Sequence, residues 1–170
     1  MKTNRLIYLP LGGSGEIGMN MYIYGYGIPG KERLIMVDVG VTFPQMDSSP
    51  GVELIMPDID FILKNIDRLD GIFITHAHED HIGALGYLIE KFSVPIFCLK
   101  FTSLIALKKI EKAGYSTDKL NVVSGYEKIV QLDPFIIKFL DVPHSIPEAS
   151  SLLIETPIGK ILHTGDLKLD

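Results

Sequence analysis

The chain has 170 residues, of which 46% are hydrophobic, and its 21 acidic and 16 basic residues give a formal net charge of −5. This length suffices for one domain with its own core but not for two. The negative balance excludes a basic field over the whole molecule of the kind that attracts nucleic acid. A mean hydropathy of +0.26 predicts apolar surface that something else covers, since no apolar run reaches membrane-spanning length.

The sequence predicts a cytoplasmic protein that does not contact a membrane. The apolar stretch after Lys2 and Arg5 is broken by Pro10 and the glycines behind it before it could form the core of a signal peptide. The single cysteine, Cys98, falls in an apolar run. We therefore expect it in the core and expect no disulfide framework, as in a reducing compartment.

Apolar runs in the first part of the chain predict strands at residues 6–11, 19–26 and 34–39. The glycine-rich segment 12–18 joins the first two. It lacks the helix and the Lys-Ser/Thr pair of a nucleotide-binding loop, so we interpret it as a tight loop that lets backbone approach a site. Asp38 ends the third strand. If buried, this acid needs hydrogen-bond donors or a cation, and the alternative is an ordinary turn aspartate.

The proline-containing segment 42–58 predicts a long loop at the rim of a site. Phe43 in this loop is a candidate to stack on a nucleobase, and a role as an anchor of the loop in the core is an equal alternative. Asp58 is a candidate cap for a helix at residues 59–66.

Three histidines and one aspartate fall within six positions, directly after the buried-strand run 71–74; they are His76, His78, Asp80 and His81. Helical spacing follows at residues 82–92, so these side chains lie on a strand-to-helix turn, where they can converge. Imidazole and carboxylate are ligands of zinc and similar divalent ions. Four such groups exceed what one catalytic ion takes if water also binds, so the cluster indicates a site shared by two ions. Glu79 is expected to be solvated or structural.

The rest of the chain predicts one helix and six strands. The helix is expected at residues 103–113, capped by Thr102 and closed by Gly114, and the strands at residues 95–99, 120–123, 128–131, 135–142, 151–155 and 160–163. Lysines on this helix alternate with Glu111, which favours a solvated face over an RNA groove. Two βα units among antiparallel strands predict an α/β layered sandwich.

Two further candidate ligands follow strand ends, where side chains can converge at one edge of a sheet; they are His144 and Asp166. His144 alone would more often be a turn or core histidine, but the cluster upstream favours a ligand. His163 lies three positions before Asp166, and on a strand this odd offset turns it to the opposite face. We therefore leave His163 out of the predicted site.

The segment His76-Ala77-His78-Glu79-Asp80-His81 resembles the His-x-His-x-Asp-His motif of the metallo-β-lactamase superfamily. Together with residues 11–21, 74–83, 144–148 and 162–166, it makes nearly the whole chain resemble the ribonuclease J family of the beta-CASP branch. The resemblance implies an αββα sandwich. It also implies that residues 1–170 are an incomplete, N-terminal form of the metallo-β-lactamase-like domain, without the beta-CASP and C-terminal regions.

The resemblance further implies which residues bind metal. His76, His78 and His144 would hold one divalent ion, and Asp80, His81 and Asp166 the other, with Asp166 shared. Asp38 would be a supporting residue beside the site. The ions would be zinc, with manganese as the alternative, and a hydroxide bound between them would hydrolyse RNA phosphodiesters, with Asp80, His81 and Asp166 as the catalytic residues.

Three functions from different classes follow. The first is the N-terminal half of a metal-dependent ribonuclease for RNA processing, with RNA as the partner of the full-length family; an inactive isolated chain and a complementing C-terminal half are open alternatives within this function. The second is a small-molecule metallohydrolase of the thioesterase or lactonase type. The third is a non-catalytic fragment that self-associates through exposed apolar surface. The glycine-rich segment 12–18 and the His144-Ser145-Ile146-Pro147 stretch favour the first.

Overall fold

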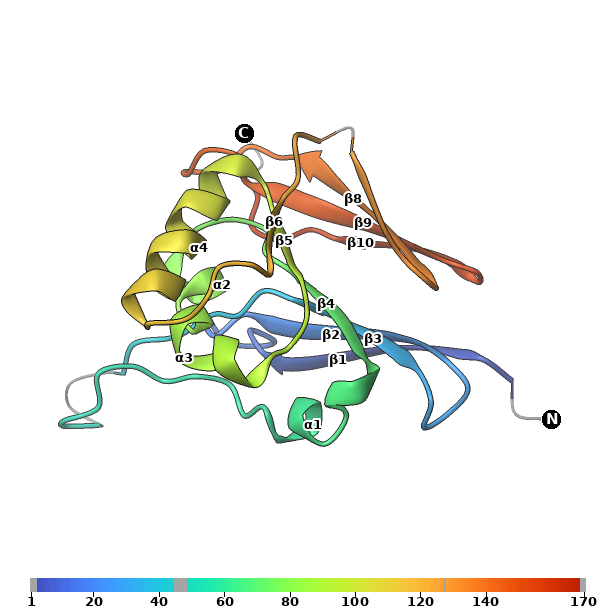
Figure 1. The fold of residues 1–170 in the computed structure, drawn as a ribbon, viewed down its shortest axis with the longest axis horizontal. Helices are drawn as coiled ribbons and strands as arrows, with labels where there is room; N and C mark the ends of the chain where they lie inside the picture. Colours follow the sequence, from blue (N-terminus) through green and yellow to red (C-terminus); the bar gives the residue numbers. More distant parts are fainter. Residues whose placement is uncertain (1–2, 45–48, 127, 169–170) are drawn as a thin grey trace.

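The computed structural model describes residues 3–44, 49–126 and 128–168. Two β-sheets lie face to face, and helices cover the outer face of the first sheet (Figure 1). Residues 45–48 of the predicted loop at 42–58 lie outside the described residues.

The first sheet has six strands in the order β1-β2-β3-β4-β5-β6. Their bounds are Arg5–Gly12, Met21–Gly27, Arg33–Val37, Leu69–Phe73, Ile96–Cys98 and Leu120–Val122. The pairs β1–β2 and β2–β3 are antiparallel, whereas the pairs from β3 to β6 are parallel. Parallel neighbours require crossover connections, which place the intervening helices against the sheet. All six strands were predicted, and Cys98 is buried as expected.

The described residues form four α-helices and two 3-10 helices. They are α1 (Asp60–Leu63), α2 (Glu79–Ile82), α3 (Leu85–Leu88), α4 (Lys100–Lys112), η1 (Ile66–Arg68) and η2 (Ile89–Lys91). They pack on one face of the first sheet, around a core that includes Met36, Ile72 and Ile110. Within the described ranges, no helix is both long and apolar enough to cross a membrane.

Two helix predictions were wrong in detail. The expected helix at 82–92 is broken into α2, α3 and η2. At the first break, a side chain on Gly83 would meet the Glu79 carbonyl oxygen at 2.4 Å, so the chain packs there with backbone against backbone. Thr102 is not a cap, because α4 begins at Lys100. The carboxylate of Glu148 instead accepts a hydrogen bond from the Phe101 amide at 2.5 Å, which ties the loop before β9 to this helix.

The two other residues predicted at helix ends lie where expected, although one of these helices is shorter than predicted. Gly114 follows α4 with φ of +82°, the left-handed conformation that glycine adopts without strain. Asp58 accepts a hydrogen bond from the Asp60 amide at 2.8 Å at the start of α1. The helix predicted at 59–66 is shorter, since α1 ends at Leu63 and η1 follows.

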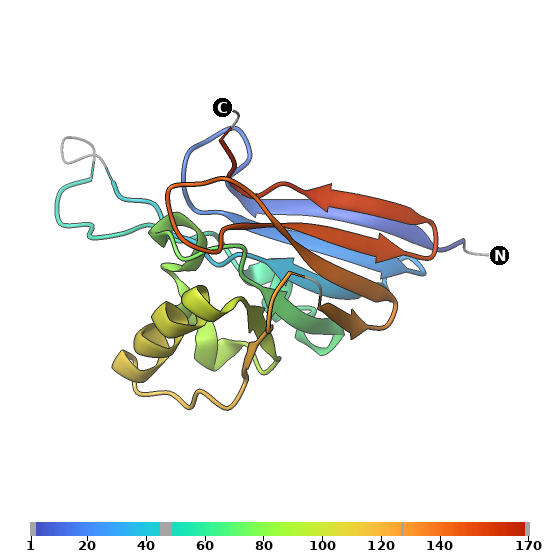
Figure 2. The same cartoon turned by 90° about the horizontal axis from the view of Figure 1, so that it is seen from above.

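The second sheet is antiparallel, in the order β10-β9-β8-β7. Its strands are β7 (Ile129–Leu132), β8 (Phe135–Asp141), β9 (Ser150–Thr156) and β10 (Gly159–His163). Alternate residues of β8 are buried, and Phe135 and Phe139 pack in the inter-sheet core together with Phe73 of β4. Seen from above, β9 and β10 lie over β1 and β2 (Figure 2).

The outer face of the second sheet carries exposed apolar side chains. Ile129 is 62% exposed, Ile136 38% and Leu162 56%. No helix of the described residues covers this face, so three of the four layers of an αββα sandwich are present. The predicted sandwich fold is therefore confirmed for the layers that the described residues form, and this face carries exposed apolar side chains of the kind that the mean hydropathy predicted.

Candidate metal centre

The turn between β4 and α2 is held in place by backbone hydrogen bonds from two neighbouring segments. The Val39 amide donates to the His81 carbonyl at 2.8 Å, and the Asn20 amide donates to the Asp80 carbonyl at 2.9 Å. A side chain on Gly40 would lie 1.7 Å from the Asp80 carbonyl oxygen, so only glycine fits there. The close approach that we expected of the glycine-rich loop at 12–18 is therefore made by Gly40 and Asn20.

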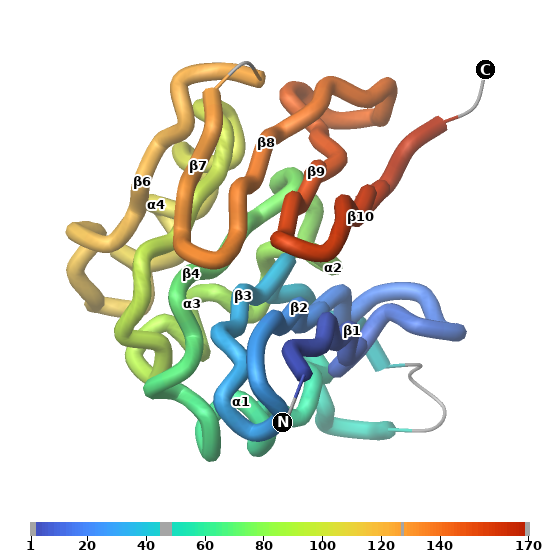
Figure 3. The backbone as a smooth tube through the Cα atoms, turned by 90° about the vertical axis from the view of Figure 1, so that its right-hand side faces the viewer, coloured from blue at the N-terminus to red at the C-terminus, as the bar shows by residue number. Residues whose placement is uncertain are grey.

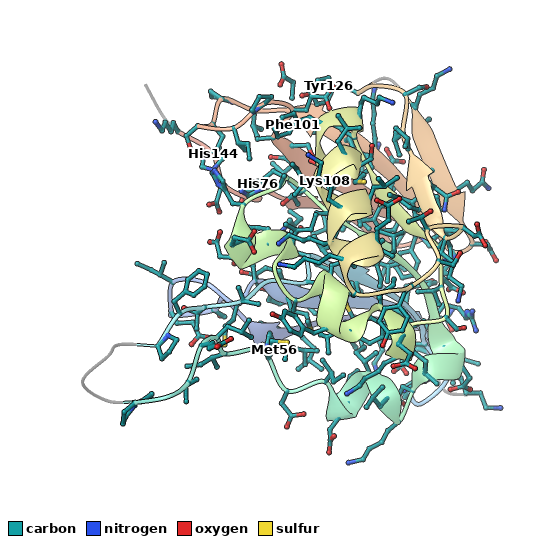
Figure 4. The ribbon with its side chains drawn as sticks, turned by 60° about the vertical axis from the view of Figure 1, so that its left-hand side comes forward. Met56, His76, Phe101, Lys108, Tyr126 and His144 are labelled. Carbon is teal, nitrogen blue, oxygen red and sulfur yellow. The ribbon has the colours of Figure 1, made fainter. Side chains whose placement is uncertain are left out.

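One cluster joins the turn to the second sheet. His78 Nδ1 lies 3.1 Å from His76 Nε2 and 3.1 Å from His144 Nε2. Asp166 completes the group, whose four ligand atoms all lie within 4.8 Å of one another. Figure 4 shows His76 and His144 coming together from different segments at the same side of the molecule.

A second cluster lies beside the first and shares one residue with it. His81 Nε2 is 3.5 Å from Asp80 Oδ2 and 3.4 Å from Asp166 Oδ1. The other oxygen of Asp166 faces the first cluster, 3.8 Å from His144 Nε2. The structure thus brings all six predicted ligands together, in the two groups that the resemblance implies.

The donor set of the first cluster fits a cation. An imidazole nitrogen has either one proton or one lone pair, so His78 Nδ1 can satisfy only one of the two ring nitrogens that face it. A metal ion accepts a lone pair from each of three such nitrogens. His144 Nδ1 is also buried without a partner among the described residues. Nitrogen and carboxylate donors in this number are typical of zinc sites.

Asp38 fixes the orientation of the His81 ring through a hydrogen bond to Nδ1. Its carboxylate is fully buried and accepts hydrogen bonds from His81 Nδ1 at 2.8 Å and from the Thr75 amide at 2.8 Å. The Thr75 hydroxyl also donates to this carboxylate, at 2.9 Å. Because a carboxylate can only accept here, the proton of neutral His81 is held on Nδ1, and Nε2 is left facing the second cluster.

Burial and the charges of the site move the pKa values of His76 and His81 in opposite directions. Burial and the neighbouring His81 lower the pKa of His76 to about 3. Burial also acts to lower the pKa of His81, but the charge of Asp38 and hydrogen bonds to Asp166 and Asp38 outweigh it and raise that pKa to about 10. The hydrogen bond from His81 in turn lowers the pKa of Asp166 to about 2. Protons and metal ions therefore compete for the second cluster.

Sequence reasoning missed two supporting residues. Asn20 Nδ2 lies 3.3 Å from Asp80 Oδ2 and 3.1 Å from His81 Nε2. The hydroxyl of Tyr22 donates to Asn20 Oδ1 at 2.7 Å and fixes the orientation of the amide. Both residues lie about 60 positions from the turn, and no local spacing marks them.

The remaining candidates lie outside both clusters. Glu79 is half exposed and pairs with Lys109 of α4 at 2.7 Å, a structural role. His163 Nδ1 bonds the Tyr24 hydroxyl at 2.9 Å, on the inner face of β10. Phe43 is 63% exposed, so it is no anchor in the core. It lines a cavity of about 610 Å³ together with Tyr87 and other residues, and its contact with a base stays a prediction.

Comparisons with known proteins point to one superfamily. The family profile described as Metallo-beta-lactamase superfamily matches residues 16–170. Ribonuclease J of Sinorhizobium meliloti is 45% identical over 170 residues, which is 99% of this chain and 30% of that protein. Ribonuclease J of Corynebacterium glutamicum is 42% identical over 99% of this chain and 23% of its own length. The chain thus spans less than a third of these relatives.

Solved structures share the fold. A protein of unknown function from Enterococcus faecalis V583 matches with a TM-score of 0.65 and 21% identity, over 99% of this chain and 44% of that one. The metallo-beta-lactamase fold protein YhfI from Bacillus subtilis matches with a TM-score of 0.61 and 17% identity, over 96% of this chain and 63% of its own. With the family match over residues 16–170, this chain belongs to the metallo-beta-lactamase superfamily.

Proposed function

We propose that this chain supplies the N-terminal part of the metallo-β-lactamase-like domain of a metal-dependent ribonuclease. The observation that carries the proposal is that Asp166 belongs to both donor clusters, so that two divalent ions would be held side by side. RNA as the substrate is supported by the identity of 45% with a protein named Ribonuclease J over 99% of this chain. Homology over this length favours RNA over thioesters or lactones.

In this proposal His76, His78 and His144 hold one ion, Asp80 and His81 hold the other, and Asp166 contacts both. Zinc fits the nitrogen-rich donors best, and manganese is the alternative. Two such ions, when bound, supply Lewis acidity toward a phosphoryl oxygen and lower the pKa of water to near neutrality.

The protein's own residues prepare this site before substrate arrives. Asp38 keeps the proton of His81 on Nδ1 and so presents Nε2. Asn20 donates toward Asp80 and, through Tyr22, is itself held in one orientation. These groups are set on strand ends and a short turn anchored by Gly40, so the donors need little reorganisation.

The test compares substrates and two neighbouring variants. Zinc- or manganese-loaded protein is assayed on single-stranded RNA, a thioester and a lactone, with Asp80→Asn and Glu79→Gln alongside the parent chain. Asp80 lies in a cluster, whereas the adjacent Glu79 pairs with Lys109. We expect RNA hydrolysis that Asp80→Asn abolishes and Glu79→Gln retains. Turnover of the thioester or lactone without turnover of RNA would contradict the proposal.

A further inference from the structure

His144 lies in the loop of residues 142–149, the orange segment that joins β8 to β9 in Figure 3. At the base of this loop the Val142 amide donates to the Ala149 carbonyl at 3.4 Å. The other two histidines of the first cluster lie on the turn after β4, in a different part of the chain. The geometry of this cluster therefore depends on how the loop is held against the rest of the fold.

The ring of His144 has no side-chain partner of the kind that orients the other ligands. His81 Nδ1 donates to Asp38, and His76 Nδ1 lies 3.0 Å from the Thr75 hydroxyl. By contrast, His144 Nδ1 is buried without a hydrogen-bond partner among the described residues. Metal-binding histidines are usually fixed by a hydrogen bond to this second ring nitrogen. Since this bond is missing within the described ranges, the backbone of the loop sets the direction of the ring.

Two contacts fix the chain that follows His144. At the start of β9, the amide and the hydroxyl of Ser150 both donate to the Thr75 carbonyl, at 3.2 Å and 2.7 Å. Two residues earlier, the carboxylate of Glu148 accepts a hydrogen bond from the Phe101 amide at 2.5 Å. Figure 4 shows Phe101 and His144 in the same upper part of the molecule. Glu148 thus ties the loop to the first turn of α4.

The start of α4 is a favourable place for this carboxylate. The first amides of a helix have no acceptor within the helix, and the helix dipole favours a negative charge beside them. Leu99 at the N-cap position gives no side-chain hydrogen bond, and the first turn contains no acidic residue. Because Ala106 and Ile110 of α4 are buried in the core, the helix is a firm support. Glu148 therefore connects the loop to a fixed element by a charge-assisted hydrogen bond.

The backbone of Glu148 supports the same interpretation. Its φ is +56°, in the left-handed region that costs free energy for a residue with a side chain and is easiest for glycine. Such conformations persist where the surrounding contacts fix them, and they are common at functional sites. In the described ranges the other non-glycine residues with positive φ are Met19, next to Asn20, and Asp38, which both adjoin the second cluster. The carboxylate, and not the backbone, accounts for a glutamate at this position.

We propose that Glu148 is a positioning residue of the first cluster. By fixing the loop of residues 142–149 to the start of α4, its carboxylate holds His144 Nε2 toward His78 and Asp166. The inference rests on the metal centre of the proposed function and adds a residue that belongs to neither donor cluster. Loss of this contact weakens the binding of one ion only, because the second cluster has no ligand from the loop.

The experiment compares three variants with the parent chain. Glu148→Gly removes the carboxylate but adopts a positive φ without strain. Glu148→Gln keeps the length and an uncharged oxygen acceptor. Glu79→Gln is the matched control, because it also removes a carboxylate contact with α4, the half-exposed pair with Lys109, which contributes little to stability. Titration of zinc against a chromophoric chelator gives the two affinities, and His78→Ala identifies the one that belongs to the first cluster.

We expect Glu148→Gly to weaken the binding of the first ion roughly 10-fold, the lower end of the range for loss of a residue that orients a metal ligand. The affinity for the second ion should stay unchanged, and Glu148→Gln should recover most of the loss. A merely structural role would instead weaken both ions in parallel with a lower free energy of unfolding of the metal-free chain. An unchanged first affinity in Glu148→Gly, or equal losses at both ions, would overturn the inference.

Hydrogen exchange of the metal-free chain gives a second readout. The Phe101 amide should exchange faster in Glu148→Gly than in the parent, and Glu79→Gln should leave its rate unchanged. Equal rates in Glu148→Gly and the parent would contradict the contact itself. Should Glu148→Gly fail to fold, Glu148→Gln still decides, because its weaker hydrogen bond predicts a smaller loss confined to the first ion.

The outcome is separable from that of the proposed function, because no RNA is present in these measurements. A chain that binds two ions without hydrolysing RNA, and loses affinity for the first ion in Glu148→Gly, contradicts only the ribonuclease proposal. A chain that hydrolyses RNA while Glu148→Gly keeps the parent's affinity for both ions contradicts only the role of Glu148.

Discussion

The carboxylate of Asp38 accepts a hydrogen bond from His81 Nδ1 at 2.8 Å, and both side chains are almost completely buried. Replacement of Asp38 by Asn keeps the size of the side chain but removes the charge that holds His81 in this tautomer. We expect Asp38→Asn to weaken metal binding at the second cluster roughly 10- to 100-fold. Competition titration with a chromophoric chelator measures this, and an unchanged affinity would refute the positioning role.

The shared position of Asp166 predicts an asymmetry between ligand variants. Asp166→Asn removes a donor from both clusters, whereas His78→Ala removes a donor from the first cluster alone. We expect Asp166→Asn to lower the affinity for both ions and His78→Ala to lower it for one. Native mass spectrometry of the loaded variants counts the ions, and Glu155→Gln on β9, which belongs to neither cluster and is paired with Lys160, is the control. Equal losses from both ligand variants would disagree with a shared carboxylate.

Replacement of Gly40 by a larger residue is predicted to cause a steric clash. A methyl group there would lie 1.7 Å from the Asp80 carbonyl oxygen, so either the turn or the strand end must move. We expect Gly40→Ala to lower the free energy of unfolding by roughly 1–3 kcal/mol and to displace Asp80. Gly86→Ala, whose closest contact is 3.0 Å, is the milder control. Urea unfolding compares the two, and equal stability of both variants would count against this packing.

The buried carboxylate of Glu32, outside the candidate metal centre, predicts a pH dependence of folding stability. It is 2% exposed and paired with Arg5 at 2.6 Å and Arg68 at 2.8 Å. Burial acts to raise the pKa of this carboxyl, but hydrogen bonds from backbone amides and Arg5 outweigh it and lower the pKa below 4.5.

The carboxyl of Glu32 has a lower pKa in the folded state than in the unfolded state. Its ionised form therefore contributes its full stability above the unfolded pKa, and this stability is lost as the pH falls through the folded pKa. Glu32→Gln should therefore be less stable than the parent at neutral pH, and the difference should shrink as the solution is acidified. Urea unfolding at a series of pH values measures it. A difference that grows toward acid would have the wrong sign.

Much of this fold could be predicted because its signals are local. The strands of both sheets follow apolar runs, and β8 alternates buried and exposed residues as its sequence suggests. His76, His78, Asp80 and His81 are close in sequence, so a single turn brings them together. His144 and Asp166 could be added because each follows a strand end.

The features that the sequence did not predict depend on contacts between distant segments. The helix expected at 82–92 is broken at Gly83, where a Cβ would meet the side chain of Val41 from a distant segment, a neighbour that periodicity does not encode. The start of α4 is satisfied by Glu148, 47 residues away, and not by the nearby Thr102. The support of Asp80 by Asn20 likewise depends on β2 lying beside the turn.

We propose that the described residues hold two divalent ions side by side, with Asp166 as the shared carboxylate. The most direct test is the metal content per chain, by elemental analysis after loading with zinc or manganese and exhaustive dialysis. We expect close to two ions per chain, fewer in Asp166→Asn and an unchanged number in Glu79→Gln. A value near zero for the parent chain would contradict it, because the six donors would then be close together without binding metal.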